Sequence, residues 1–444
     1  MQVVILAGGI GKRIAPLGIN KPKAMFQIMG KPLIHHVLDL VVNAAINVDE
    51  VVIVIAPGEN PIREYVESKS EWSFSIKFAM QEQPLGQANA LVQARPAVKG
   101  DFLVLNANDI YDPSLLKDLS ALGEKQSLHI GLVGREVSNP NDYGVMAFDA
   151  RGRLNCVIEK PPLGKEPSNI AVLGLYYFSP DIWKALESTP RGETDDQLER
   201  AYQKLIEVGG GGYIKYDSYF ASYKFPWHLL TISDILLREK CMRRTSEEAI
   251  ISPLAHIEGN VIIESGARVL EFAVLRGPAY IGKNNIIGNG VLLRGGVSLG
   301  TGCVVGYGTE ISHSIFGNDC WMHKNFIGDS IISDNCSFGA GTITANLRFD
   351  EKSVKVGIAD KRVSSGMDHF GIIMAEDCRT GCNAVLSPGT KIGPNSIVGP
   401  NVTLREDLPP NKMVTLIKES YRRDNNYIDL RALSREQRMR MLKK

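Results

Sequence analysis

The sequence predicts an α/β domain with a mostly parallel sheet at residues 1–238, followed by a left-handed parallel β-helix at residues 251–408. Three observations favour this division. Apolar strands alternate with helical stretches in the first half, a mostly charged hinge follows at residues 239–250, and an aliphatic residue then recurs at every sixth position. The chain has 444 residues, more than one typical hydrophobic core accommodates. Residues 409–444 form a separate tail.

The composition excludes several classes of protein. The net charge is +1, from 50 basic and 49 acidic residues, so the totals do not favour binding to nucleic acid or to a membrane surface. The chain begins with an expected strand instead of a signal peptide, and it has no apolar run of about 18 residues. The seven cysteines lack the spacing of a disulfide framework or a zinc site. We therefore expect a soluble, cytoplasmic protein.

A glycine-rich loop follows the first predicted strand, at residues 3–6. Gly8, Gly9 and Gly11 allow the backbone to approach a ligand and to point N–H groups at phosphate oxygens, and Arg13 and Lys23 add positive charge. The loop is not a Walker A loop, because it lacks the first glycine and the final Ser or Thr. It is a weak match to a dinucleotide-binding fingerprint. The pattern favours a polyphosphate cradle, and the alternative is a glycine turn with solvated charges.

A carboxylate follows another predicted strand of the first domain. Asn108 and Asp109 come directly after the apolar segment 102–106. Ligands of open α/β sheets bind beyond the carboxyl ends of the strands, where the glycine loop also lies. Asp109 is therefore a candidate ligand of Mg²⁺, a cation that prefers oxygen ligands; the alternative is a turn Asp that caps the next helix.

The segment from Leu6 to Lys23 resembles the signature loop L-A-G-G-x-G-x-R…K-P-K of the sugar-1-phosphate nucleotidyltransferases. The resemblance implies a Rossmann-like domain in which a sugar-1-phosphate oxygen attacks the α-phosphorus of a nucleoside triphosphate and pyrophosphate leaves. Arg13 and Lys23 would neutralise charge in this reaction, and Asp109 would bind Mg²⁺. The implied nucleotide-binding residues are Leu6, Ala7, Gly8, Gly9, Gln81 and Gly86. A slim pocket around Gln81 and Gly86 favours UTP or dTTP over a guanine nucleotide.

Motifs for the sugar follow further along the chain. By the same resemblance, Gly144, Glu159 and Asn169 would contact sugar hydroxyls, and Lys160 would contact the sugar phosphate. Taken alone, Glu159 and Lys160 have the pattern of an exposed ion pair.

The family's second metal-binding Asp has no counterpart in this sequence. Ser222 or His228 occupies the expected neighbourhood, and Asp217 is the nearest carboxylate. The second metal ligand is therefore unassigned.

The second half of the chain has the hexapeptide repeat of a left-handed parallel β-helix, in which three hexads make one triangular coil. Small residues, among them four cysteines, occupy a second inward position of the hexads, so we interpret these cysteines as core residues. The four are Cys303, Cys320, Cys336 and Cys378. The aliphatic positions are Ile251, Ile257, Ile263, Val269, Leu275, Ile281, Ile287, Leu293, Leu299, Val305 and Ile311. The same register returns at Met374, Thr380, Leu386, Ile392, Val398 and Leu404.

The repeat slips in two places, near residues 316–327 and at an excursion over residues 345–371. Irregular insertions in a solenoid often serve binding or assembly. His323 lies in the first of them and could act as a general base that takes a proton from an amine attacking a thioester. The alternative is an ordinary histidine of the coil.

The segments 323–329 and 338–352 resemble the acetyltransferase half of the bifunctional family of glucosamine-1-phosphate acetyltransferases and UDP-N-acetylglucosamine pyrophosphorylases. The resemblance implies that His323 is the base, that Asn346 and Lys352 bind the sugar phosphate, and that a homotrimer binds acetyl-CoA between neighbouring β-helices. Phe326 and Ser337 replace the family's Tyr and Asn.

Three hypotheses follow from the sequence. The first is an enzyme that forms a nucleotide sugar and also acetylates an amino-sugar-1-phosphate. The second keeps the nucleotidyl transfer and makes the β-helix purely structural, which Phe326 and Ser337 favour. The third is a non-catalytic regulatory subunit with the same domain plan, against which the retained Gly8, Arg13 and Asp109 argue. The tail, in which Ser434 opens a predicted short helix, is interpreted as a solvated face or a lid on the last coil.

Overall fold

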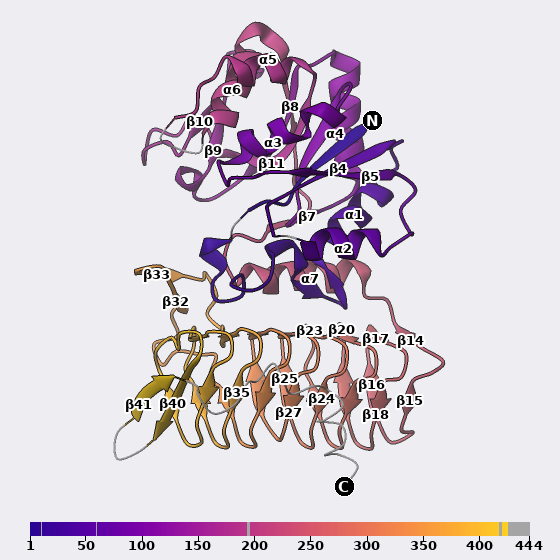
Figure 1. Ribbon diagram of the computed structural model, residues 1–444, viewed down its shortest axis with the longest axis vertical. Coiled ribbons are helices and arrows are strands. Elements are labelled where there is room, and N and C mark those ends of the chain that lie inside the picture. The colour runs from indigo at the N-terminus through magenta and orange to yellow at the C-terminus, as the bar shows by residue number, and fades with distance from the viewer. Residues whose placement is uncertain (10, 59, 193–195, 417–419, 425–444) are drawn as a thin grey trace. The chain divides into compact units, whose positions relative to one another are not determined.

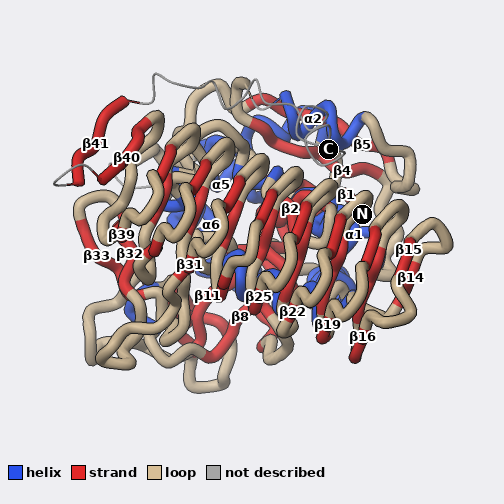
Figure 2. Tube along the Cα trace, turned by 90° about the horizontal axis from the view of Figure 1, so that it is seen from below, coloured by secondary structure: helices blue, strands red, loops and turns tan. Residues whose placement is uncertain are grey.

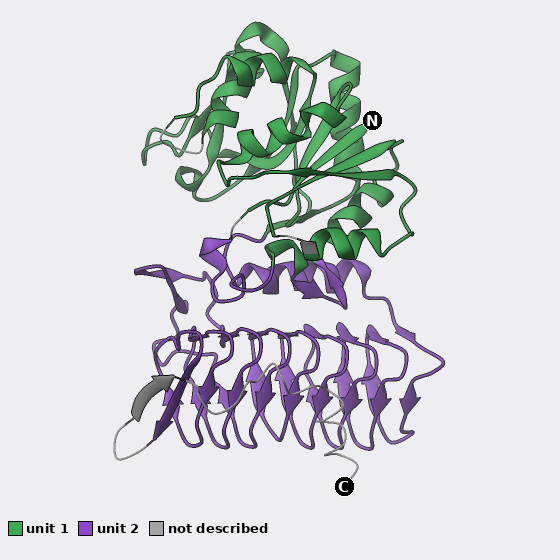
Figure 3. Ribbon diagram, in the orientation of Figure 1, with its two compact units in different colours: residues 1–10, 22–25, 33–222 green, residues 11–21, 26–32, 223–444 purple. Residues whose placement is uncertain are grey.

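The computed structural model describes residues 1–9, 11–58, 60–192, 196–416 and 420–424 (Figure 1). The helix predicted near Ser434 lies outside the described residues. The chain forms two compact units, which are considered separately (Figure 3). The first unit comprises residues 1–10, 22–25 and 33–222, and the second comprises residues 11–21, 26–32 and 223–444.

The first unit is built on a nine-stranded sheet with the order β10-β9-β11-β6-β1-β4-β5, to which β8 and β12 are added (Figure 1). β6, β1, β4 and β5 are parallel, so their carboxyl ends meet at one edge, as the apolar segments of the sequence predicted. β11 pairs antiparallel with β6, β8 and β9. The strands are β1 (Gln2–Leu6), β4 (Glu50–Ile55), β5 (Ser75–Met80), β6 (Phe102–Asn106), β8 (Ile130–Glu136), β9 (Gly144–Phe148), β10 (Leu154–Glu159), β11 (Ile170–Phe178) and β12 (Gly211–Lys215).

Helices cover the faces of this sheet because their apolar stripes bury against it. α3 packs on β1, β4 and β5, whereas α4 packs on β8, β11 and β12. The short strand β7 (Asp109–Tyr111) pairs with β13 (Phe220–Ser222) in a separate two-stranded ladder. The helices are α1 (Leu33–Asn43), α2 (Asn60–Glu67), α3 (Gln87–Ala94), α4 (Ser114–Gln126), α5 (Asp181–Glu187) and α6 (Gln197–Leu205), with short helical turns η1 (Lys12–Ile14) and η2 (Lys23–Met25) in the signature loop.

The second unit contains a parallel β-helix whose three faces are three sheets (Figure 2). The first face is β14 (Arg244–Thr245), β17 (Val261–Ile263), β20 (Ala279–Ile281), β23 (Val297–Leu299), β26 (Ile315–Phe316), β29 (Ile331–Ile332), β34 (Ile373–Met374) and β37 (Lys391–Ile392). The second face is β15 (Ile250–Ile251), β18 (Arg268–Val269), β21 (Ile286–Ile287), β24 (Val304–Val305), β27 (Trp321–Met322), β30 (Ser337–Phe338), β35 (Arg379–Thr380), β38 (Ile397–Val398), β40 (Lys412–Leu416) and β41 (Ser420–Asp424). The third face is β16 (His256–Glu258), β19 (Val274–Arg276), β22 (Leu292–Leu293), β25 (Glu310–Ser312), β28 (Phe326–Gly328), β31 (Ile343–Thr344), β36 (Val385–Leu386) and β39 (Thr403–Leu404).

The aliphatic hexad positions form the core of this β-helix. From Ile263 to Leu404 they are buried, while Ile251 and Ile257 of the first coil are partly covered. Cys303, Cys320, Cys336 and Cys378 are fully buried in the same core, as predicted. Each of these four thiols donates a hydrogen bond to a backbone carbonyl of the following coil.

The predicted slip of the repeat corresponds to shorter coils. Ile311 pairs with Ile327, sixteen residues later, whereas Ile287 pairs with Val305, eighteen residues later. The excursion at residues 345–371 leaves the coil after β31 and contains the hairpin of β32 (Lys355–Ile358) and β33 (Lys361–Ser364). The backbone closes its base, because Phe370 N donates to Asn346 O at 2.8 Å.

The remaining segments of the second unit contact the β-helix. The helix α7 (His228–Lys240) precedes it. The hinge predicted at residues 239–250 contains β14, which already pairs with β17 of the β-helix. Lys21 Nζ lies 2.6 Å from Asp334 Oδ2, and Met29 N donates to Ser298 Oγ at 2.9 Å. No helix within the described ranges is long and apolar enough to cross a bilayer.

Candidate active sites

The glycine loop of the first unit begins at the carboxyl ends of the parallel strands. Leu6 and Ala7 are buried, and Ala7 N donates to Val54 O of β4 at 2.8 Å. A Cβ on Gly8 would lie 2.9 Å from Gln81 Oε1, so a larger residue there would displace the Gln81 side chain. Gly9 is exposed and has open space around its Cα. The loop therefore offers backbone to a ligand beyond this edge.

Gln81 orders the segment that follows β5. Its side chain is buried, and its amide nitrogen donates to Gly86 O at 3.0 Å and to Asn89 Oδ1 at 3.1 Å. Gly86 has φ 96° and precedes α3, a backbone conformation that favours glycine. The structure thus brings Gly8, Gln81 and Gly86 together. The side-chain oxygen Oε1 of Gln81 points toward Gly8.

Two amide side chains hold the carboxylate of Asp109. Asn106 Nδ2 donates to Oδ2 at 2.9 Å, and Asn108 Nδ2 donates to Oδ1 at 3.0 Å. Asn106 Nδ2 also donates to Gly174 O of β11 at 3.1 Å. Asp109 is only 2% exposed, and hydrogen bonds to the charged form stabilise a buried carboxylate. Burial, and then the charge of Asp109, raises the pKa of Tyr111 well above its ordinary value, so this phenol stays neutral.

Ser222 lies directly opposite Asp109 in the β7–β13 ladder. A carboxylate, a hydroxyl and amide oxygens are hard donors, and Mg²⁺ commonly binds to one or two carboxylates plus substrate phosphates and water. The residues present therefore fit Mg²⁺ with one protein carboxylate. Within the residues that the structure describes, no group of three or more His, Cys, Asp or Glu side chains could hold a metal ion.

The residues predicted for the sugar lie on the antiparallel side of the first unit. Gly144 of β9 pairs with Glu159 of β10, and a Cβ on Gly144 would lie 2.8 Å from Glu159 Oε2. Lys160 is exposed, has φ 45°, and its Nζ lies 3.7 Å from Glu159 Oε1. Asn169 is exposed and directly precedes β11. β11 therefore passes from Asn169 toward Gly174 and the Asp109 carboxylate.

Two basic residues of the signature loop occupy short helical turns. Lys23 lies half-buried in η2. Arg13 lies in η1 and belongs to the second unit, where its guanidinium is 5.7 Å from the ring centroid of Phe225. His228, which the sequence offered as an alternative to Ser222, begins α7 in the second unit, and its Nδ1 accepts from Lys224 N at 3.3 Å. Of the two residues, Ser222 is the one that pairs with β7.

His323 projects from a corner of the β-helix between β27 and β28. The side chain is exposed, while the neighbouring Asn325 is 5% exposed. The Asn325 Oδ1 accepts from His323 N, and its Nδ2 donates to Gly339 O at 2.8 Å and to Thr342 O at 3.2 Å. A buried amide thus fixes the backbone that presents an accessible imidazole.

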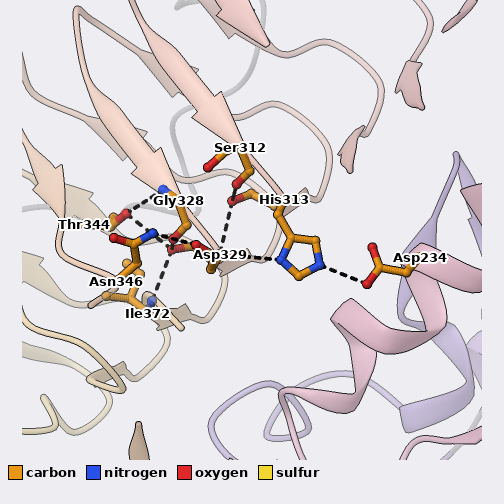
Figure 4. A network of polar contacts seen from close by, with 10 residues as sticks. Asp234, Ser312, His313, Gly328, Asp329, Thr344, Asn346 and Ile372 are labelled. Atoms are coloured by element: carbon orange, nitrogen blue, oxygen red, sulfur yellow. Dashed lines mark hydrogen bonds and ion pairs between the residues drawn. The ribbon is translucent and has the colours of Figure 1, made fainter. Parts of the chain in front are cut away.

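Asn346 lies at the opposite edge of the same face, because it follows β31 whereas His323 precedes β28, and these strands pair in parallel. Asn346 Nδ2 donates to Asp329 Oδ2 at 2.6 Å, and Asp329 Oδ1 lies 2.7 Å from His313 Nδ1 (Figure 4). His313 Nε2 in turn lies 3.0 Å from Asp234 Oδ2 of α7. Within a single chain, His323 and Asn346 therefore lie at different edges of the third face.

The two carboxylates control the protonation of His313. Burial alone would lower its pKa, but the hydrogen bonds and charges of Asp234 and Asp329 outweigh burial and raise it from 6.5 to about 10. His313 is therefore a cation at neutral pH, held between two anions.

Three further residues of the predicted acetyl-transfer site are half-buried or exposed. Lys352 is exposed in the excursion, six residues after Asn346. Phe326 is half-buried on β28 and pairs with Glu310 and Ile343. Ser337 begins β30, opposite Trp321. Phe326 brings no polar atom to the third face, and Ser337 brings a hydroxyl where the resembling family has an amide.

Sequence reasoning missed four residues that hold these sites, namely Gly174, Asn325, His313 and Asp329. Gly174 lies far along the chain from Asn106, and Asp329 lies one coil away from both His313 and Asn346. No local pattern in the sequence therefore marks Gly174 or Asp329. Asn325 carried a signal, since a polar residue at an inward position of a hexad requires hydrogen-bond partners.

Comparison with known proteins agrees with both halves of the fold. The family model described as "Nucleotidyl transferase" matches residues 2–217, and the model described as "Bacterial transferase hexapeptide (six repeats)" matches residues 278–313 and 371–406. The fold and sites therefore define a transferase that joins a nucleotidyltransferase domain to a hexapeptide acetyltransferase-type domain.

Full-length relatives identify the family. The "Bifunctional protein GlmU" of Methanocaldococcus jannaschii is 33% identical over 426 residues, covering 96% of this chain and 98% of that protein. The GlmU of Methanococcus maripaludis is 32% identical over 416 residues, covering 93% and 97%. The "Bifunctional sugar-1-phosphate nucleotidylyltransferase/acetyltransferase" of Sulfurisphaera tokodaii is 31% identical over 418 residues, covering 92% and 98%. The chain belongs to this GlmU family of bifunctional sugar-1-phosphate nucleotidyltransferase/acetyltransferases.

Proposed function

We propose that the first unit transfers a nucleotidyl group from UTP or dTTP to a sugar-1-phosphate at the edge lined by Gly8, Gln81 and Asp109. A phosphate oxygen of the sugar-1-phosphate attacks the α-phosphorus in line, the bond to the β-phosphate breaks, and pyrophosphate leaves. Backbone N–H groups of Gly8 and Gly9, with Arg13 and Lys23, stabilise the charge that develops on the phosphates. The observation that carries this assignment is the buried Asp109 carboxylate, held by Asn106 and Asn108.

Mg²⁺ would be held by Asp109, with Ser222 and the substrate phosphates as further oxygen ligands. When bound, the metal neutralises phosphate charge. Gly144, Glu159 and Asn169 bind the sugar hydroxyls, and Lys160 binds the sugar phosphate. The pairing of Gly144 with Glu159 supports this assignment, because the lack of a side chain at Gly144 leaves room for the Glu159 carboxylate over the strand.

The β-helix acetylates the amino group of an amino-sugar-1-phosphate with acetyl-CoA. The neutral amine attacks the thioester carbonyl, His323 accepts the proton that the nitrogen loses, and the bond to sulfur breaks to release CoA as the thiol once it takes up a proton. Asn346 and Lys352 bind the sugar phosphate. The observation in favour is the exposed His323 on a backbone fixed by the buried Asn325.

The acetyl-transfer site is completed between copies of the chain in a homotrimer. His323 and Asn346 lie at opposite edges of the third face, so they meet only where one copy's face adjoins its neighbour's. Exposed apolar side chains beside this edge support such an interface, namely Ile343, Leu347 and Phe349.

The functional domains are residues 1–238 and 251–408, and the protein acts in the cytoplasm. The seven free cysteines support a reducing compartment.

Two product assays on one purified protein test this proposal. With Mg²⁺, we expect pyrophosphate from UTP or dTTP with glucose-1-phosphate or N-acetylglucosamine-1-phosphate, and free CoA from acetyl-CoA with amino-sugar-1-phosphates. Pyrophosphate without CoA would favour a structural β-helix, consistent with the apolar Phe326. The absence of both products across a broad panel of substrates would contradict the proposal and favour the regulatory role.

A further inference from the structure

Three polar side chains form a column at one corner of the β-helix. Ser312 pairs with Gly328, and Phe326 pairs with Ile343, so His313, Asp329 and Asn346 occupy the same position in three successive coils (Figure 4). His313 has φ 40° and Asp329 has φ 48°, so both turns adopt the same left-handed conformation. The column is therefore a built feature of this corner, with one hydrogen bond between each pair of neighbours.

Asp329 lies at the centre of this column and holds both ends of the excursion at residues 345–371. Its Oδ2 accepts from Asn346 Nδ2 at the start of the excursion, and its backbone oxygen accepts from Gly371 N at the end, at 2.8 Å. Asp329 N donates to Ser312 O of the preceding coil at 3.0 Å. The residue is 8% exposed, so these contacts are largely shielded from water. The base of the excursion that carries Lys352 is thus anchored at one residue, by its carboxylate at the start and by its backbone oxygen at the end.

The carboxylate also determines which way the Asn346 amide points. An ionised carboxylate accepts hydrogen bonds but cannot donate them, so it selects the Nδ2 end of the amide. The carbonyl oxygen Oδ1 is then turned away from Asp329. Asn346 therefore presents its acceptor oxygen and its second N–H in a fixed orientation.

His313 supplies the positive charge that stabilises Asp329 at this corner. The imidazole lies between Asp329 and Asp234, so each carboxylate faces a cation instead of the other carboxylate. A buried carboxylate without a cationic partner is costly, so the contact with His313 stabilises the carboxylate that orients Asn346. Through Asp234, the column is also tied to α7.

We propose that Asp329 is a positioning residue for acetyl transfer, which fixes the amide of Asn346 and the base of the 345–371 excursion, and that His313 holds Asp329 in place. This inference rests on the proposed role of Asn346 in binding the sugar phosphate. The column is therefore expected to affect substrate binding through Asn346, because Asp329 contacts Asn346 and does not itself contact the substrate.

The first test is the variant Asp329→Asn, which keeps the shape of the side chain but can donate as well as accept, so it no longer selects one orientation of Asn346. We expect the KM for the amino-sugar-1-phosphate to rise about 10- to 100-fold, the range for loss of a charged hydrogen bond, with little change in kcat. A loss of folded protein would instead lower kcat per chain and leave KM unchanged. Asp360→Asn is the matched control, because Asp360 is exposed in the hairpin of the same excursion. An unchanged KM in Asp329→Asn would overturn the proposal.

A double-mutant cycle with Asn346→Ala tests whether Asp329 acts through Asn346. We expect Asp329→Asn to add little to the KM of Asn346→Ala, since the two residues form one unit. Fully additive effects would contradict the proposed route. His313→Gln should raise the same KM in the same direction.

Hydrogen–deuterium exchange separates this inference from the acetyl-transfer proposal. Asp329→Asn should speed exchange in peptides covering residues 345–371 and leave those covering residues 261–299 unchanged. If the unmodified protein releases no CoA with any amino-sugar-1-phosphate, both the proposed acetyl transfer and the role of Asp329 in it are wrong. The exchange measurement then still tests whether Asp329 anchors the excursion. Unchanged exchange at residues 345–371 would overturn the anchor as well.

Discussion

Asn106 and Gly174 are in contact beside the Asp109 carboxylate, where Asn106 Nδ2 donates to Gly174 O at 3.1 Å. A Cβ at position 174 would lie 2.4 Å from that nitrogen and 3.3 Å from Asp109 Oδ2. The absence of a side chain at residue 174 therefore lets Asn106 reach both β11 and Asp109.

The variant Gly174→Ala should displace Asn106 and weaken its hold on Asp109. We expect kcat/KM for pyrophosphate release to fall about tenfold or more, as for loss of a hydrogen bond to a charged group, and more Mg²⁺ to be needed for half-maximal rate. Gly100→Ala is the control, because a Cβ at Gly100 meets nothing within 4 Å. Equal Mg²⁺ dependence in Gly174→Ala and Gly100→Ala would rule out this role of Gly174.

Arg13 is expected to stabilise the charge on the transferred phosphate. The variant Arg13→Ala should lower kcat for nucleotidyl transfer by about 10²- to 10³-fold, the range for loss of one charge-stabilising donor. Arg63→Ala is a matched control, because Arg63 also lies over an aromatic ring, 4.8 Å from the centroid of Phe78, but belongs to neither site. The assignment of Arg13 is wrong if both variants turn over at the unmodified rate.

The stability of the β-helix should depend on pH through His313. Its pKa is raised from 6.5 to about 10 in the folded chain, so folding favours the protonated form. The resulting stabilisation is fully present below about pH 6.5 and is lost as pH rises toward about 10.

Urea unfolding over this pH range tests that prediction. His313→Gln should be less stable than the unmodified chain near neutral pH, and the difference should shrink at alkaline pH. His256→Gln, at an exposed position on β16, should leave the pH dependence unchanged. If the difference in unfolding free energy between His313→Gln and the unmodified chain does not change with pH, His313 stabilises the β-helix by packing alone.

The sequence predicted the parts of the structure that follow from a repeating or local pattern. The six-residue period located the buried positions from Ile263 to Leu404, because each hexad turns one aliphatic side chain inward. The sequence also placed Asp109 just beyond a parallel strand, because the end of an apolar segment marks an edge of the sheet. The period also located the slip after Ile311, where the coil is shorter.

The partners of the site residues could not be predicted in the same way. Asn106 meets Gly174 through the pairing of β6 with β11, and Asp234 meets His313 through the approach of α7 to a corner of the coil. Both contacts join residues far apart in sequence, so neither leaves a local pattern. The contact between Arg13 and Phe225, which belong to the same unit, is a third such case. The signature loop alone predicted only that Arg13 lies in a phosphate cradle.

The proposed function gives one chain two separate activities, with His323 as the base of the second. The most direct measurement is the rate of CoA release and of pyrophosphate release by His323→Asn, each compared with the unmodified protein. We predict that CoA release falls about 10²- to 10⁴-fold, the usual contribution of a general base, while pyrophosphate release is unchanged. CoA release at the unmodified rate by His323→Asn would contradict the account.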